Sequence, residues 1–315
     1  MQAEAWSSLN RTSSIQYPVS RLRDIESTMN YLRLIRLPNV FTALADVWAG
    51  FFFCLSVGQS PNWFHLGMLM VASGCLYAGG IALNDVSDLE WDRIHRPERP
   101  LPSGAISKRN AVILVNVLLT IAIVSAIAVG KQSLAVSFAL VGAIVLYNYM
   151  SKSFAPFAAA GMGSCRFFNL LLGATAFPGG WKVAWLPAAF LGVYIFFVTL
   201  ISRMEDAEVK VLRLALMAAA LILVALGTAS LYQPDFLLRG FGILVWVPVL
   251  LGNRAIQALK EATPAAVGGV IGTSILCIIL IDSALVMGTG HRMFGLICAA
   301  FIIPSLFLSR RFAMT

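Results

Sequence analysis

Long apolar runs constrain the fold of this 315-residue chain more than any other feature of its sequence. A helix needs about 20 apolar residues to cross the hydrocarbon core of a bilayer. Runs of this kind recur along the chain, at 39–58, 64–83, 110–129, 133–150, 157–177, 184–202, 211–231, 237–252, 265–288 and 292–308. They predict an all-α, polytopic membrane protein with nine to ten transmembrane helices. Nine stays an alternative because only a very short turn separates the last two runs.

The composition agrees with a membrane protein and excludes several other classes. Hydrophobic residues make up 59% of the chain and charged residues only 12%, with a mean hydropathy of +0.81, whereas a soluble domain is about a quarter charged. The cysteines are scattered through the apolar runs without a CxxC pair or other metal-ligand spacing, so we expect them to pack as small apolar residues. The histidines are also far apart, and no haem or zinc site is indicated.

The distribution of basic residues predicts the orientation in the membrane. With ten spans and the N-terminus inside, the opposite side holds only Lys131, Lys182, Arg239 and Arg292, and nearly all other Lys and Arg residues lie on the inner side. Such a bias is typical of cytoplasmic segments. We therefore expect a multi-pass protein of the cell (inner) membrane, with its N-terminus and its acidic motifs in the cytoplasm. The bias also accounts for the net charge of +8 without nucleic-acid binding.

We expect the chain to divide into a short N-terminal cytoplasmic segment, 1–37, and a transmembrane domain, 38–315. We expect no cleavable signal sequence in the first segment, because no apolar core follows a short basic head. Within it, residues 20–37 place apolar side chains at helical spacing with arginines beside them. This pattern predicts an amphipathic helix on the cytoplasmic membrane interface, and an ordinary solvated helix is the alternative.

One stretch, 84–104, breaks the apolar pattern and concentrates charge at the end of the second run. It reads NDVSDLEWDRIHRPERPLPSG. Asn84, Asp88 and Asp92 are spaced by four residues, so on a helix they form one polar stripe. Carboxylate and amide oxygens on such a stripe can anchor Mg²⁺, which keeps coordination positions open for phosphate oxygens. A solvated cytoplasmic loop is the plainer alternative for this stretch.

Basic and aromatic residues around this stretch are candidates for binding a diphosphate and its apolar tail. The basic candidates are Arg96, Arg99, Lys108, Lys152 and Arg166. Arg binds phosphate oxygens in pairs, and Lys acts as a point charge. A cavity within the lipid-embedded part would hold the apolar tail and keep water from quenching a carbocation. Aromatic side chains near the polar ends of the spans, Tyr147 among them, would face that cation.

Polar residues inside the apolar runs form a further group. Asn39 and Asp46 lie in the first run, Arg166 and Asn169 in the fifth, and Asp282 in the ninth. Charged side chains at membrane depth face a cavity or a partner rather than lipid. We therefore expect Arg166 to bind an anion or a carboxylate.

These motifs together resemble the UbiA superfamily of intramembrane prenyltransferases. The similarity rests on Asn84-Asp85-x-x-Asp88-x-x-x-Asp92, on the HRPERPLPSG that follows, on Lys152, on Arg166-x-x-Asn169, and on RLPN at 36–39. It covers the chain from residue 30 to residue 308, and its first motif is highly specific.

The resemblance implies a UbiA-type bundle of transmembrane helices around a central cavity, with cytoplasmic caps near 84–109 and 203–210. The caps carry aspartate-rich motifs that bind an isoprenyl diphosphate through Mg²⁺, and the enzyme transfers its prenyl group to an acceptor. The metal-binding residues would be Asn84, Asp88, Asp92, Glu205 and Asp206, with Asp88, Asp92 and Asp206 catalytic. The diphosphate would contact Arg96, Arg99, Lys108, Lys152, Arg166 and Arg203. The cavity and acceptor residues would be Asn39, Asp46, Tyr147 and Asn169.

The second motif departs from the family pattern, which usually has DxxxD at this place. This chain has Glu205-Asp206-Ala207-Glu208, followed by Val209 and Lys210. The departure puts in question a complete second Mg²⁺ site and a role in activating the acceptor, and it argues against the best-known quinone branches. The sequence SRMED at 202–206 is similar to the branch encoded in bacterial ebo-type gene clusters, for which we expect a polyol acceptor such as a cyclitol.

Three functions are weighed. The favoured one is Mg²⁺-dependent transfer of an isoprenyl group from an allylic isoprenyl diphosphate to a small or lipid-soluble acceptor in the bilayer. A membrane terpene cyclase of the same fold, which needs no acceptor, is the second. A non-catalytic lipid or metabolite transporter is the third, but transporters carry their polar groups near the bilayer midplane, whereas the charges here gather at one face. The acceptor, the prenyl length and the type of bond are not specified by the sequence.

Overall fold

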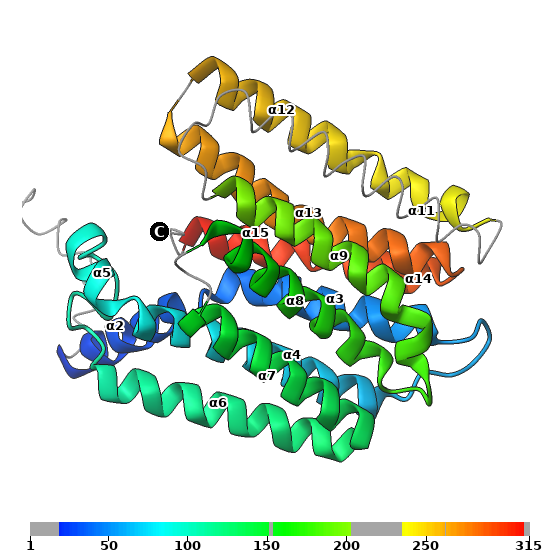
Figure 1. The fold of residues 1–315 in the computed structure, drawn as a ribbon, viewed down its shortest axis with the longest axis horizontal. Helices are drawn as coiled ribbons and strands as arrows, with labels where there is room; N and C mark the ends of the chain where they lie inside the picture. Colours follow the sequence, from blue (N-terminus) through cyan, green and yellow to red (C-terminus); the bar gives the residue numbers. More distant parts are fainter. Residues whose placement is uncertain (1–18, 151–153, 203–234, 262, 312–315) are drawn as a thin grey trace, which may run out of the picture.

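The computed structural model describes residues 19–150, 154–202, 235–261 and 263–311, and helices make up nearly all of this part. The helices before residue 203 are α2 (Val19–Leu34), α3 (Leu37–Cys54), α4 (Trp63–Ser87), α5 (Leu89–His95), α6 (Lys108–Val129), α7 (Lys131–Met150), α8 (Ala155–Ala174) and α9 (Gly180–Ser202). Those after residue 234 are α11 (Phe236–Leu244), α12 (Trp246–Glu261), α13 (Pro264–Gly288), α14 (Arg292–Ala300) and α15 (Ile302–Arg311). The long helices lie side by side, and α2 and α5 lie at one end of the bundle (Figure 1).

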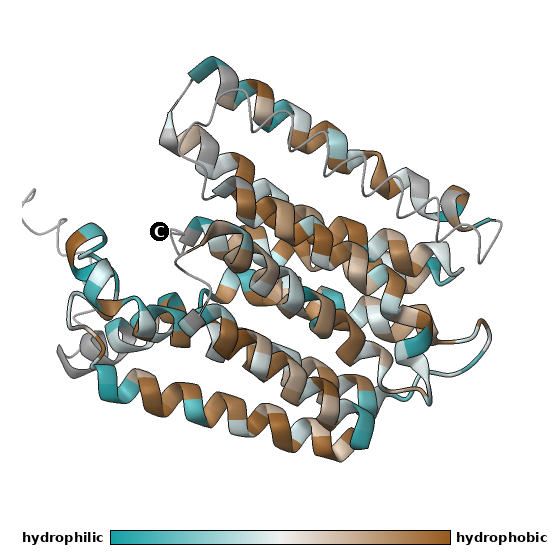
Figure 2. Ribbon diagram, viewed as in Figure 1, coloured by the Kyte–Doolittle hydropathy of each residue, from teal (hydrophilic) through white to brown (hydrophobic). Residues whose placement is uncertain are grey.

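The helices confirm the prediction of an all-α, polytopic membrane protein. Seven segments in the described ranges are long and apolar enough to cross a bilayer: 37–54, 63–87, 108–129, 131–149, 180–200, 268–288 and 292–310. Of the other predicted runs, 157–177 corresponds to α8 and 237–252 to the shorter helices α11 and α12. The run 211–231 lies outside the described residues, so the number of nine to ten spans stays a prediction. Apolar residues cover most of each long helix, and hydrophilic residues gather at α5 (Figure 2).

Helix α3 lies at the centre of the bundle and packs against α4, α8, α13 and α15. In the most apolar window of its span 67% of the residues are buried, whereas in that of α6 only 22% are buried. Apolar side chains of α6 such as Ile113, Val124 and Ile127 are exposed, as expected for a helix whose outer face meets lipid. The central position of α3 places its polar residues in the core of the bundle.

Two glycines allow α3 and α8 to pack closely. A β-carbon at Gly50 would overlap the carbonyl oxygen of Leu170 in α8, and one at Gly173 would overlap the carbonyl oxygen of Val47 in α3. Small residues at a contact between membrane helices let the two backbones approach. This close approach sets the polar residues of α3 against those of α8.

The end of the bundle formed by α2, α5 and the turn 96–107 is called the cap end here. Leu34 of α2, Leu89 of α5, and Leu101 and Ile106 of the turn are buried in one cluster. The turn leads into α6, whose first turn is capped by Ser107, because its hydroxyl oxygen accepts a hydrogen bond from the backbone of the third helical residue. The apolar cluster thus holds the charged stretch against the bundle.

A helix is present where the sequence predicts one near the N-terminus. It runs from Val19 to Leu34, and α3 begins three residues later with a proline in its first turn. The position of this helix on the membrane interface, and the domain boundary at 37/38, stay predictions.

Candidate functional site

Helix α4 carries the first acidic motif to the cap end and ends there. Asp88 follows its last residue with φ −93° and ψ 1°, and α5 then runs in a new direction (Figure 1). Hydrogen bonds of four-residue spacing continue through the break, from Asp88 N to Asn84 O at 3.0 Å and from Asp92 N to Asp88 O at 2.8 Å. The single straight stripe predicted for these three residues is therefore bent at Asp88.

Asn84 and Asp88 remain neighbours after this bend, while Asp92 has a different partner. Asn84 Nδ2 donates to Asp88 Oδ2 at 3.2 Å. Asp92 is 1% exposed, and its Oδ2 accepts from Arg99 Nη1 at 2.9 Å. Its other oxygen, Oδ1, has no hydrogen-bond partner in the part of the chain that the structure describes. Because buried polar atoms are nearly always paired, such an oxygen is a candidate ligand for a cation.

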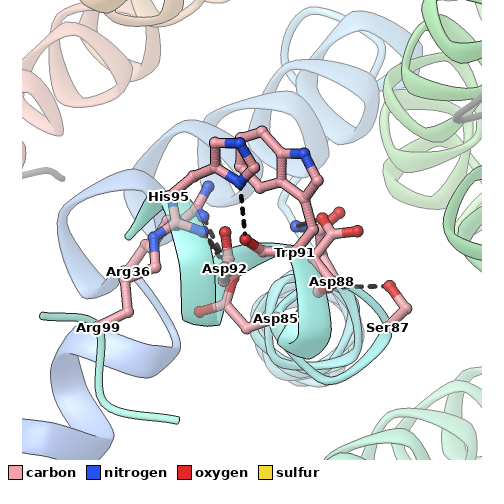
Figure 3. A network of polar contacts seen from close by, with 9 residues as sticks. Arg36, Asp85, Ser87, Asp88, Trp91, Asp92, His95 and Arg99 are labelled. Carbon is pink, nitrogen blue, oxygen red and sulfur yellow. Dashed lines mark hydrogen bonds and ion pairs between the residues drawn. The ribbon is translucent and has the colours of Figure 1, made fainter. Parts of the chain in front are cut away.

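Two arginines balance the buried acids at the cap end. Arg99 Nη1 lies 3.6 Å from Asp85 Oδ1, and Arg36 Nη2 donates to the same oxygen at 3.3 Å. Figure 3 shows Asp85 and Asp92 facing the two arginines, with Asp88 apart from that group. Arg99, predicted to contact a diphosphate, is thus held between two carboxylates of the protein.

Arg36 also has an unusual backbone conformation. It is the only non-glycine residue with positive φ among the described residues, at φ 48° and ψ 56°. The left-handed region is unfavourable for a residue with a β-carbon, and strain of this kind is frequent at functional sites. In this chain the strained residue lies at the start of α3, next to the acidic motif.

The other predicted charged site residues are exposed or lie outside the described part. Arg96 is exposed, with its Cζ 5.3 Å from the centroid of the Trp91 ring. Lys108 is exposed at the first residue of α6. The residues outside the described ranges are Lys152, Arg203, Glu205 and Asp206. Their assigned roles stay predictions.

A cavity of about 130 Å³ lies between α4, α7 and α8 and reaches Arg36 and Asn84 at the cap end. Much of its lining is apolar, including Leu76, Ile81, Leu140, Ile144 and Met162. Further polar lining residues are Tyr77, Tyr147, Asn148, Arg166 and Asn169. A polar mouth that continues into apolar walls suits an amphiphilic ligand with a charged head and a hydrocarbon tail.

Two of the residues predicted to line the cavity or contact the acceptor lie in the cavity wall, and two lie deeper. Tyr147 and Asn169 belong to the lining. Asn39 is 8% exposed and Asp46 is 0% exposed. Neither of these two is among the lining residues.

Asp46 holds two lining residues in place from behind. Its Oδ2 accepts from Arg166 Nη1 at 2.9 Å and from Asn169 Nδ2 at 2.8 Å. Arg166 Nη2 also donates to Thr42 Oγ1 at 2.8 Å, and Asn169 Oδ1 accepts from Ser73 Oγ at 2.8 Å. The carboxylate expected near Arg166 is therefore Asp46, brought to it by the close contact of α3 and α8.

Helix α13 adds a second acid to this buried group. Asp282 and Asp46 are both 0% exposed, and Asp282 lies close enough to Asp46 and Arg166 to interact with them electrostatically. Both oxygens of Asp282 and Oδ1 of Asp46 have no hydrogen-bond partner among the described residues. Of the two acids, Asp46 is the one paired with Arg166.

The sequence analysis did not select Arg36, Tyr77 or Asn148 as site residues. Tyr77 precedes Asn84 by two helical turns, so the helical repeat alone places both on one face of α4. Arg36 stands two residues before Pro38 at the entry to the first span, where a basic side chain can reach a ligand at the membrane boundary. Asn148 gave no signal beyond its place near the end of a run.

Comparison with known proteins identifies the family. The model of the UbiA prenyltransferase family matches residues 43–258. Digeranylgeranylglyceryl phosphate synthase of Sulfolobus acidocaldarius is 33% identical over 189 residues, which cover 58% of this chain and 65% of the relative. The enzyme of the same name from Saccharolobus solfataricus is 34% identical over 188 residues, which cover 56% of this chain and 61% of the relative. These matches span less than two thirds of the length of the relatives.

Solved structures share the fold at lower identity. One from work on digeranylgeranylglyceryl phosphate synthase in membranes has a TM-score of 0.58 at 20% identity and covers 84% of this chain and 99% of that chain. An apo UbiA homologue from Aeropyrum pernix has a TM-score of 0.59 at 18% identity, covering 78% and 96%. A UbiA homologue from Archaeoglobus fulgidus bound to GPP and Mg²⁺ has a TM-score of 0.53 at 15% identity, covering 86% and 99%. With the family model matching more than half of its residues, the chain belongs to the UbiA prenyltransferase family.

Proposed function

We propose that this protein transfers an isoprenyl group from an allylic isoprenyl diphosphate to an acceptor within the membrane, with Mg²⁺ as cofactor. The observation that carries the proposal is the buried Oδ1 of Asp92, which has no hydrogen-bond partner among the described residues, at the same end of the bundle as Asn84, which lines the cavity. A candidate cation ligand at the polar end of a largely apolar cavity fits a substrate with a diphosphate head and an apolar tail. Membership of the family supports the same reaction class.

Asn84, Asp88 and Asp92 are the residues that would hold Mg²⁺. Among the described residues, no three His, Cys, Asp or Glu side chains converge closely enough to bind a metal by themselves. The first motif therefore supplies two carboxylates and one amide, a partial set that suits Mg²⁺ because this ion keeps water and substrate phosphates in its shell. When bound, Mg²⁺ would neutralise charge on the diphosphate and make it a better leaving group. Glu205 and Asp206 are the proposed second set.

Arg36 is the basic residue that we assign first to the diphosphate. It lines the cavity beside Asn84, and its side chain is 30% exposed, so a ligand can reach it. Arg99 is only 6% exposed and bonded to Asp92, so its role is to hold the carboxylates. Further contacts are assigned to Arg96, Lys108, Lys152 and Arg203.

The apolar walls would accept the isoprenyl chain and protect a developing cation. Loss of diphosphate from an allylic carbon leaves positive charge, which the rings of Tyr77 and Tyr147 in the lining can face. A cavity enclosed by membrane helices also limits the access of water to this carbon. The residues Asp88, Asp92 and Asp206 are the proposed catalytic carboxylates.

The acceptor class proposed first is a glyceryl phosphate-type lipid. The name of the relatives denotes a glyceryl phosphate that carries two geranylgeranyl groups.

The concentration of Lys and Arg on one side of the predicted topology supports a cytoplasmic cap end.

A transfer assay tests the proposal. Membranes containing the protein receive labelled geranylgeranyl diphosphate, geranylgeranylglyceryl phosphate and Mg²⁺, and a labelled lipid product is expected. A chelator should abolish it, and Asp92→Asn should lower it by about a hundredfold or more, since loss of one electrostatic contact to a reacting group costs roughly that much. Glu90→Gln is the matched control, because Glu90 is exposed and its ion-pair partner among the described residues is the exposed Arg93 at 2.9 Å. Undiminished transfer in Asp92→Asn would refute the metal assignment.

A cyclase would give a different result in the same assay. The label would appear in a cyclised hydrocarbon, with no acceptor supplied.

A further inference from the structure

Arg166 lies deeper in the bundle than the acids of the cap end. Tyr77 precedes Asn84 on α4 by about 10 Å, given a rise of 1.5 Å per residue. Arg166 Cζ lies 5.3 Å from the centroid of the Tyr77 ring, and both residues line the cavity. Tyr77, the neighbour of Arg166, is therefore about two helical turns from Asn84 along α4, and we infer that Arg166 faces a different part of the bound substrates from a diphosphate held at Asn84.

The guanidinium of Arg166 is fixed by the protein and keeps donors for a ligand. Arg166 is 6% exposed, and its Nη1 and Nη2 donate to Asp46 and Thr42. A guanidinium has five N–H groups. No other hydrogen bond of Arg166 is present among the described residues. A rigidly oriented donor group in a cavity wall is a built binding subsite.

The charge of this subsite is already balanced. The Asp46 carboxylate neutralises Arg166 at 2.9 Å. Asp282, also fully buried, brings no cation to the group. The other titratable side chains that face the group are Tyr77, Cys165 and Cys298. Phenol and thiol groups are neutral at pH 7 by their ordinary values, so the group has no uncompensated positive charge.

A subsite without uncompensated positive charge selects against an anion at membrane depth. A phosphate or carboxylate bound here would add a negative charge without a counterion, which is costly in the interior of a membrane protein. An uncharged oxygen requires only an N–H donor, and Arg166 has N–H groups besides those that donate to Asp46 and Thr42.

We propose that Arg166 is a specificity-determining residue that binds an uncharged oxygen of the prenyl acceptor: a hydroxyl, ether or carbonyl oxygen. This inference rests on the proposed transferase function. The attacking atom of the acceptor must come within about 3–3.5 Å of the donor carbon, which lies near the diphosphate at the cap end. The acceptor therefore carries an uncharged oxygen several bonds away from its attacking atom, and any anionic group that it has binds elsewhere.

The decisive experiment compares a single substitution with a charge-neutral double substitution. Arg166→Gln leaves the Asp46 carboxylate buried without its cation, whereas Arg166→Gln/Asp46→Asn removes both members of the ion pair and keeps an amide donor at position 166. Purified full-length protein is titrated with geranylgeranyl diphosphate and Mg²⁺ for donor binding. The same protein is then added to membranes of the source organism for incorporation of label into lipid. Arg93→Gln, at an exposed pair, is the control.

We expect Arg166→Gln to lower the incorporation of label at least a hundredfold. The double variant should incorporate at least ten times as much label as Arg166→Gln. Donor affinity should stay within twofold in both variants. A double variant as inactive as the single one would show that the positive charge itself binds an anion, and would overturn the proposal. A parallel loss of donor affinity would also overturn it, because Arg166 would then belong to the diphosphate site.

Mass spectrometry of the labelled product supplies an independent test. The acceptor part should contain an uncharged oxygen apart from the prenylated atom, and an acceptor without one would overturn the inference while leaving the transferase function intact. Absence of donor binding and of incorporation in the wild type would instead refute the proposed function, whatever the behaviour of the variants at position 166.

Discussion

The protein contains two buried groups of arginines and carboxylates. Each includes an arginine–carboxylate pair of the same length, but the groups differ in the number of arginines per acid. Arg99 and Asp92 at the cap end are joined at 2.9 Å, and so are Arg166 and Asp46 in the interior. In each pair one carboxylate oxygen lacks a donor among the described residues. The cap end balances two acids with two arginines, whereas the interior has one arginine for two acids.

This difference in the number of arginines is why we propose different roles for the two groups. At the cap end each acid lies beside an arginine, and Asp92 Oδ1, which has no hydrogen-bond partner among the described residues, can ligate a cation. In the interior the one arginine is already paired with Asp46, which leaves a group suited to hydrogen bonding with an uncharged partner. Depth reinforces the contrast, because charge becomes more costly towards the middle of the membrane.

The largest expected effect on stability comes from breaking the interior pair. Asp46→Ala removes the carboxylate that is paired with Arg166 at 2.9 Å, and loss of one member of a buried pair costs about 3–5 kcal/mol. Asp85→Ala at the cap end should lower the free energy of unfolding clearly less. Arg99 keeps its ion pair with Asp92, and the partly exposed Arg36 can be hydrated. Thermal unfolding of both variants in detergent measures the difference. Equal losses would remove the distinction between the two groups.

A second, smaller effect is expected at the helix contact that brings the interior pair together. Gly173→Ala forces a β-carbon against the Val47 carbonyl oxygen, and overpacking of this kind costs about 1–3 kcal/mol. Gly142→Ala is the control, because a β-carbon at Gly142 meets nothing within 4 Å. Thermal unfolding should separate the two alanine variants, and indistinguishable melting temperatures would mean that α3 and α8 approach less closely than described.

The smallest effect is expected for Asp282→Asn. Neither oxygen of Asp282 has a hydrogen-bond partner among the described residues, so an amide of the same shape removes no such bond. The free energy of unfolding should therefore change by less than about 1 kcal/mol, the usual net value of one hydrogen bond. A loss as large as that of Asp46→Ala would show that Asp282 supports Arg166 as strongly as Asp46 does, and the comparison would fail.

Much of the architecture could be predicted because it depends on local patterns. The length of the apolar runs predicts the described spans. The spacing of Asn84, Asp88 and Asp92 predicts a polar stripe at the cap end without any knowledge of tertiary contacts. The bend at Asp88 was not predictable from that spacing. A four-residue repeat describes an ideal helix, and the pairing of Asp92 with Arg99 depends on how the turn 96–107 folds back.

The contacts between distant helices could not be predicted from one sequence. Arg36 and Asp85 are separated by 49 residues, and Arg166 and Asp46 by 120. Each polar residue was recognisable as costly in lipid, but helical periodicity does not say which helices are neighbours. The glycines that bring α3 against α8 carry that information only once the packing is known.

The most direct test of the central claim is a lipid analysis of cells of the source organism that lack the protein. Mass spectrometry should reveal a prenylated lipid that is missing in these cells, returns with the wild-type protein and does not return with Asp92→Asn. Identical lipids with and without the protein, or full restoration by Asp92→Asn, would contradict the account.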